Sequence, residues 1–127
     1  MQGKQIYEYA LIRVVPRVER EEFLNVGAIL LCKRKKFLDV KIHLDEKRVS
    51  AFSDKVDLDE LKEHLDAWKW ICEGGKEGGE IGKLDIASRF RWLTATRSTI
   101  IQSSKVHTGV CENPELVLED LFQKYVL

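Results

Sequence analysis

A group of hydrogen-bond donors without any carboxylate lies in the window Ile86–Cys111. The window contains no aspartate or glutamate, yet it holds all the threonines of the chain and four fixed cations. Its candidate ligand-binding residues are Arg89, Arg97, Ser98, Gln102, Ser104, His107 and Thr108. Guanidinium, hydroxyl, amide and imidazole groups all donate hydrogen bonds to phosphate or carboxylate oxygens. The window therefore predicts an anion-binding patch, and we expect Arg13 from an early strand to contribute to it.

A second interpretation of these side chains stays open at this point. Some of them could satisfy backbone groups inside the fold, because buried polar groups need hydrogen-bond partners. The arginines could also pair with distant acids such as Glu8, Glu21 or Glu22, because an unpaired buried charge is costly. The window alone does not decide between internal pairing and a foreign ligand.

His107 raises an enzymatic alternative, in which it acts as acid and base on a phosphate ester or nucleotide while the arginines stabilise developing charge. A serine nucleophile would need an elbow motif and an acid to orient the imidazole, and the window has neither. The enzyme would draw its carboxylate from elsewhere, for example Glu8, Glu22 or Asp45. The sequence assigns no catalytic residue and leaves open whether a reaction is catalysed.

Motifs for metals and nucleotides are absent from the sequence. The histidines show no i,i+4 zinc spacing, and the cysteines show no C-x-x-C pair. The glycine-rich segment 74–82 fails as a Walker A motif because Glu77 replaces the first glycine and Leu84 replaces the magnesium-binding hydroxyl. We therefore expect no metal and no cofactor, and we interpret 74–82 as a mobile surface loop.

Charge and length limit the classes of function. Lysine and arginine total 21 and aspartate and glutamate also total 21, so the chain has no general attraction for nucleic acid or anionic membranes. The basic run Lys33–Lys36 reads as a solvated hairpin turn. The longest apolar run, Val26–Cys32, is far shorter than the ~20 residues of a spanning helix. Together with three unpatterned cysteines, this predicts a cytoplasmic protein without a membrane or nucleic-acid partner.

The hydrophobic pattern predicts an α+β fold in a single domain covering 1–127. Strands are expected at 6–15, 23–32, 37–44, around 98–103 and at 106–110. Helices are expected after Asp57, at 84–93 and after Asn113, with the first and last as the two main helices. The helix at 84–93 should place Arg89 and Trp92 on one side. The sheet is expected to be antiparallel or mixed, with about four or five strands.

Three separated motifs resemble a known family. They are Tyr7-x-Tyr9-Ala10-x-Ile12-Arg13-x-Val15-Pro16, then Glu22-Phe23-x-Asn25-Val26-Gly27, then Arg89-Phe90-x-x-Leu93-x-Ala95-x-Arg97-Ser98 with Gln102, Ser104, His107 and Gly109. In this order they are similar to the bacterial DUF3037 family, which has no established activity. Genes of that family often neighbour one for a HipA-like kinase, so the resemblance implies a protein partner of that class. We expect a small binding or accessory domain that holds a phosphate-bearing or otherwise anionic group.

Overall fold

The computed structural model describes residues 3–97 and 99–127. Its strands are β1 (Gln5–Val14), β2 (Leu24–Cys32), β3 (Phe37–Ile42), β4 (Ile101–Ser103) and β5 (His107–Cys111). Its α-helices are α1 (Glu46–Phe52), α2 (Leu58–Glu73), α3 (Gly79–Gly82), α4 (Ile86–Thr94) and α5 (Pro114–Tyr125). Short 3-10 turns lie at Val18–Arg20, Lys33–Lys35 and Lys76–Gly78. The expected α+β fold is confirmed, with more helices than the two main ones.

The strands form one antiparallel sheet in the order β3-β2-β1-β4. Strand β5 also pairs with β1, along its first half, whereas β4 pairs along its second half. The edge of β1 is therefore shared by two short strands that follow one another in the chain. This arrangement brings the end of the donor window directly beside the first strand.

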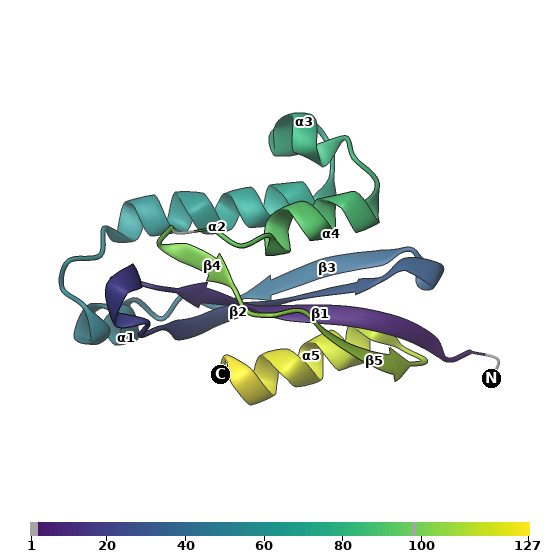
Figure 1. The fold of residues 1–127 in the computed structure, drawn as a ribbon, viewed down its shortest axis with the longest axis horizontal. Helices are drawn as coiled ribbons and strands as arrows, with labels where there is room; N and C mark the ends of the chain where they lie inside the picture. Colours follow the sequence, from purple (N-terminus) through teal and green to yellow (C-terminus); the bar gives the residue numbers. More distant parts are fainter. Residues whose placement is uncertain (1–2, 98) are drawn as a thin grey trace.

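Helices cover both faces of the sheet. Figure 1 shows α2 and α4 above the sheet and α5 below it. The upper core joins Ala10, Ile12 and Val14 of β1 to the apolar sides of α2 and α4. The lower core joins Ala28 and Leu30 of β2 to α5. β1 is thus an interior strand with two apolar faces.

Strand β2 carries a β-bulge opposite the end of β1. Ile12 pairs with Gly27, but the next pair is Arg13 with Asn25, so Val26 is the extra residue. Val26 points into the upper core, and Asn25 is placed across from Arg13. Gly27 is required here because an added Cβ would lie 2.8 Å from the Lys41 carbonyl oxygen.

The helix boundaries follow their capping residues. Asp57 accepts hydrogen bonds from the backbone amides of Asp59 and Glu60, and Asn113 accepts one from Leu116. Helix α1 was not expected; it begins after Asp45, whose carboxylate accepts from the Arg48 amide. These caps satisfy amides that the first turn of a helix leaves without a partner.

The interpretation of 74–82 as a mobile loop needs correction. The segment folds into a 3-10 turn and the short helix α3, which pack against α2. An added Cβ at Gly78 would lie 3.0 Å from the Trp70 carbonyl oxygen, and one at Gly82 would lie 2.8 Å from the Gly75 carbonyl oxygen. The glycines here allow close backbone packing. Separately, no helix among the described residues is long and apolar enough to cross a membrane.

Candidate functional site

Arg89 is a buried structural residue at the end of α2. Its side chain is only 9% exposed, and Nη1 donates to the carbonyl oxygens of Ile71 and Cys72 at 2.9 and 2.7 Å. These carbonyls belong to the last turn of α2, where a cation also meets the negative end of the helix dipole. An added Cβ at Gly74 would lie 2.7 Å from Arg89 Nη1, so this glycine leaves room for the guanidinium. Arg89 is buried together with Phe90 and Leu93, whereas Trp92, which the sequence predicts on the same side of the helix as Arg89, is exposed.

Arg91 is paired internally with an acid from a distant part of the chain. Its two terminal nitrogens donate to the two carboxylate oxygens of Glu8, each at 2.7 Å. The carboxylate of Glu8 raises the pKa of Arg91 through these hydrogen bonds, against a smaller lowering by burial. Thr108 lies opposite Glu8 in the β1–β5 ladder and is exposed on the upper side of the sheet. Of the two open interpretations, internal pairing thus applies to Arg91.

Arg97 also lies on the upper side, against an aromatic ring. Its guanidinium carbon is 4.1 Å from the Trp92 ring centroid, and Nη2 donates to the Trp92 carbonyl oxygen at 2.6 Å. Together with His64 and Trp68, these residues line a shallow pocket of about 160 Å³ between α2, α4 and β4. The sheet therefore lies between Arg97 and the two predicted site residues on its lower face, Arg13 and His107.

Ser104 has a structural role where the chain passes from β4 to β5. Its hydroxyl accepts from the Leu11 amide at 2.8 Å and donates to the Lys105 carbonyl oxygen at 2.9 Å. The Ser104 amide also donates to the Leu11 carbonyl oxygen at 2.8 Å. Ser104 thereby fills the gap in pairing along β1, which explains its burial. The expectation for Ser98 lies outside the described residues.

Arg13 lies on the lower face of the sheet, toward α5. Its guanidinium carbon is 3.9 Å from the centroid of the Phe23 ring. Its Nε is buried without a hydrogen-bond partner, as is Oδ1 of the neighbouring Asn25. Burial lowers the pKa of Arg13, but a guanidinium stays charged in proteins. Among the described residues Arg13 forms no ion pair, so its charge is not neutralised by an internal acid.

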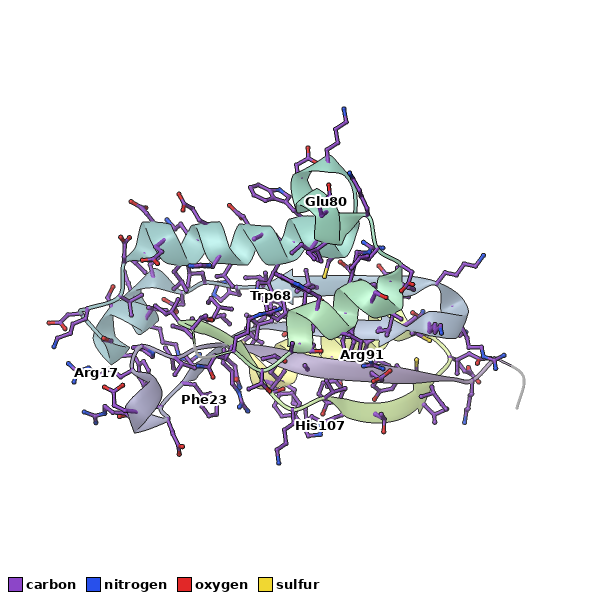
Figure 2. All side chains as sticks on the ribbon, turned by 45° about the horizontal axis from the view of Figure 1, so that its top comes forward. Arg17, Phe23, Trp68, Glu80, Arg91 and His107 are labelled. Atoms are coloured by element: carbon purple, nitrogen blue, oxygen red, sulfur yellow. The ribbon has the colours of Figure 1, made fainter. Side chains whose placement is uncertain are left out.

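His107 lies on the same lower face, stacked on an aromatic ring. It pairs with Tyr9 in the β1–β5 ladder, and the two ring centroids are 5.2 Å apart. Burial raises the pKa of Tyr9, with smaller contributions from Tyr125 and Tyr7. The imidazole is exposed and, within the described chain, forms no ion pair with a carboxylate. Figure 2 shows His107 and Phe23 below the β1 ribbon, while Trp68 lies above it.

The three carboxylates considered for the enzymatic alternative have other partners. Glu8 binds Arg91, Glu22 binds Arg20, and Asp45 caps α1. Among the residues that the structure describes, none of them forms an ion pair with His107. The described residues also contain no group of three or more histidine, cysteine or acidic side chains that could hold a metal ion.

The lower face carries an open strip, which we define as Tyr9, Arg13, Phe23, Gln102 and His107. Gln102 pairs with Arg13 in the β1–β4 ladder, and directly opposite residues share a face. Gln102 also borders the pocket of Arg97, and its Nε2 donates to the Thr99 carbonyl oxygen at 2.9 Å. Helix α5 packs mainly on β2 and β3, so it leaves this part of β1 half-exposed. Tyr9 and Arg13 are four residues apart, about 13 Å at ~3.3 Å per residue.

The two aromatic members of the strip, Tyr9 and Phe23, are not among the ligand-binding residues predicted from the sequence. The sequence places them only within the expected strands at 6–15 and 23–32. The alternation of Tyr7, Tyr9, Leu11 and Arg13 already indicated that Arg13 and Tyr9 share a face. The position of Phe23 over Arg13 depends on the turn at 16–23, for which the sequence offered no geometric signal.

Comparisons with known proteins give one match. A family model described as "Protein of unknown function (DUF3037)" matches residues 9–126. No curated protein matches the chain. No solved structure matches it either.

Proposed function

We propose that this chain, which belongs to the DUF3037 family, is a non-catalytic binding domain whose open strip receives an acidic segment of a protein partner. The observation that carries the proposal is the state of Arg13. Its guanidinium is partly desolvated, lies against Phe23 at 3.9 Å and has no acid as a partner within the described chain. A carboxylate or phosphate from a partner would supply the missing negative charge and accept hydrogen bonds from the terminal nitrogens of this half-buried side chain.

The shape of the strip favours a macromolecular partner over a small ligand. Arg13 and His107 line none of the three main pockets found in the described chain. The backbones of Arg13 and of Tyr9, the residue opposite His107, lie about 13 Å apart along an extended strand. An extended peptide segment covers such a distance, and its successive side chains would reach both ends.

The composition of the strip is that of a protein interface. Tyrosine, phenylalanine and arginine are enriched at the centres of interfaces, because they bury a large area with few rotatable bonds and still form hydrogen bonds. Phe23 and Tyr125, the last residue of α5, are each 42% exposed. A partner that covered them would gain hydrophobic free energy in addition to the ion pair at Arg13.

Hexaglutamate is a suitable probe because it presents carboxylates on an extended chain without a folded partner. Isothermal titration at low salt should show weak binding, and Arg13→Gln should reduce the affinity at least fivefold. Arg91→Gln is the matched control: it removes the same charge from the opposite side of the sheet, where Arg91 already pairs with Glu8. Equal losses in the two variants would mean that only net charge matters and would contradict the proposal.

The partner class to test first is the HipA-like kinase that the family resemblance implies. Purified kinase should bind the wild-type chain, and Arg13→Gln should weaken the complex while Arg91→Gln should not. Kinase binding that is indifferent to Arg13 would place the interface elsewhere. Binding to duplex DNA with a steep salt dependence would instead favour a nucleic-acid function.

A further inference from the structure

We infer that a second site, distinct from the open strip, binds a small phosphate monoester with an apolar body. The site is a pocket of about 430 Å³ between the β1–β2 connection and the α1–α2 connection. Its lining residues are Pro16, Arg17, Arg20, Glu22, Ser50, Ala51, Phe52, Ser53, Asp54 and Lys55. Its volume is in the range typical of small-molecule sites.

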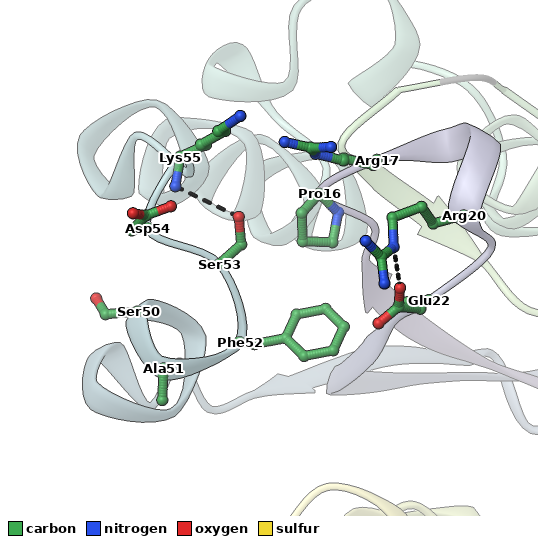
Figure 3. Close-up of a pocket in the computed structure, with 10 residues that line it drawn as sticks. All are labelled: Pro16, Arg17, Arg20, Glu22, Ser50, Ala51, Phe52, Ser53, Asp54 and Lys55. Atoms are coloured by element: carbon green, nitrogen blue, oxygen red, sulfur yellow. Dashed lines mark hydrogen bonds and ion pairs between the residues drawn. The ribbon is translucent and has the colours of Figure 1, made fainter.

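Two cations face this pocket without an internal partner. Within the described residues neither Arg17 nor Lys55 forms an ion pair. Figure 3 shows their side chains extending toward one another from the two connections, across the rim of the pocket. An anion between them would be contacted by a guanidinium fork from one side and by an ammonium from the other. Two positive groups favour a dianion, and a phosphate monoester is close to that state at neutral pH.

The acids of the pocket do not cancel this charge. The lining residues include three basic and two acidic side chains. Glu22 is paired with Arg20, so it is not available to Arg17 or Lys55. In Figure 3, Asp54 lies on the outer side of its connection, away from the gap between the two free cations. The rim around Arg17 and Lys55 therefore keeps a net positive charge.

Ser53 adds a hydrogen-bond donor at the same place. Its Oγ accepts from the Lys55 backbone amide at 3.3 Å, which leaves the hydroxyl hydrogen free to donate. Figure 3 shows the Ser53 side chain between Lys55 and Arg17. A phosphate oxygen in this position would receive hydrogen bonds from three side chains that come from both connections.

An apolar surface borders the charged rim. The side chains of Phe52 and Pro16 are half-buried and line the pocket below the cations. A ligand that carried only a phosphate would leave this surface in contact with water. An aromatic or otherwise compact apolar group attached to the phosphate would cover it and gain hydrophobic free energy.

The inference is tested with phenyl phosphate, inorganic phosphate and phenol, titrated into the full chain and followed by the backbone amide signals of a ¹⁵N-labelled sample. Phenyl phosphate should shift the amides of residues 17–22 and 50–55, with a Kd at least fivefold below that of inorganic phosphate. Phenol should bind more weakly than phenyl phosphate. Equal affinity for phenyl phosphate and inorganic phosphate would overturn the apolar part, and shifts located elsewhere would overturn the site.

Two variants complete the test. Arg17→Gln with Lys55→Gln should raise the Kd for phenyl phosphate at least tenfold, whereas Lys69→Gln, an exposed cation on α2, should leave it unchanged. All these changes are on the surface, so an unaltered amide spectrum will verify the fold. The double variant should bind hexaglutamate like the wild type, because the open strip is not changed. Unchanged phenyl phosphate binding in the double variant would contradict the inference without affecting the proposed function.

Discussion

The guanidinium of Arg13 lies against the ring of Phe23, 3.9 Å from its centroid, on the face of the sheet that α5 leaves half-covered. The ring shields one side of the cation from water, and Nε is buried without a partner. A cation in this state binds an incoming anion more strongly than a fully hydrated one, because part of its desolvation has already occurred on folding. The pair therefore forms the part of the surface best prepared for an acidic partner.

Arg89 should be essential for stability and not for binding. Arg89→Gln removes the donor shared by the Ile71 and Cys72 carbonyls and leaves a partly empty space at the end of α2. We expect a loss of about 2–4 kcal/mol in the free energy of unfolding, measured by urea denaturation. Binding of hexaglutamate to the folded fraction should be unchanged. A variant with wild-type stability would show that the two carbonyls do not depend on this arginine.

Arg91, two residues further along the same helix, should behave differently. Its side chain is 57% exposed, so the ion pair with Glu8 is largely screened by water. Arg91→Gln should lower the free energy of unfolding by less than about 1 kcal/mol. Thermal unfolding of the two arginine variants under identical conditions provides the comparison. A larger loss for Arg91→Gln than for Arg89→Gln would reverse the assignment made here.

Cys72 should stay protonated in the folded protein well into alkaline solution. Burial raises the pKa of its thiol to about 12, with Asp39 adding to the shift and Arg89 opposing it. The folded pKa exceeds the unfolded one, which is near the ordinary value of 9.0. The resulting stability is fully present below pH 9 and is lost as the pH rises toward 12. The native thiol should also react slowly with disulfide reagents at pH 8.

A pair of denaturation series isolates this thiol from the other groups that titrate at high pH. The urea midpoint of the wild type should fall more between pH 8 and pH 10.5 than that of Cys72→Ala, because the alanine variant has no thiol to ionise on unfolding. Parallel changes in the two proteins would mean that Cys72 does not contribute to the alkaline loss of stability.

Gly109 should tolerate no side chain while the ring of Tyr7 keeps its place. An added Cβ would lie 2.4 Å from Cζ and Oη of Tyr7, the residue opposite in the β1–β5 ladder. Gly109→Ala should therefore cost about 1–3 kcal/mol, as expected for overpacking. Thr108→Ala, an exposed change on the same strand, should stay within about 0.5 kcal/mol of the wild type. Equal stabilities of the two variants in urea would show that Tyr7 moves aside freely.

The strands and their faces could be predicted from the sequence, because both depend on the local alternation of side chains along each strand. Tyr7, Tyr9 and Leu11 pack toward α5, and Ala10, Ile12 and Val14 pack toward α2 and α4. The caps at Asp57 and Asn113 are local signals too. Helix α1 could not be predicted because only Val49 of its seven residues is buried, which is too few apolar positions to produce a helical pattern.

The candidate site was harder to predict because its partners are far apart in the chain. Glu8 and Arg91 are 83 residues apart, and Arg89 lies 17 and 18 residues from the carbonyls that it binds. In the sequence, the positive charge of a window without acids has no visible partner. In the fold, Arg91 pairs with Glu8 on β1, and Arg89 binds the carbonyl oxygens at the end of α2. The sequence predicts Arg13 as part of the anion-binding patch only because it lies on a strand, and the fold shows that the sheet separates Arg13 from Arg97.

The central claim is that the charge of Arg13 is available to a foreign anion. The most direct measurement is the side-chain Nε–Hε signal of Arg13 during a hexaglutamate titration of the ¹⁵N-labelled protein. We predict a saturable shift of this signal together with the His107 amide, and no comparable shift at the Nε–Hε signals of Arg89 and Arg91. Signals of Arg13 and His107 that stay unchanged while the peptide binds elsewhere would contradict it.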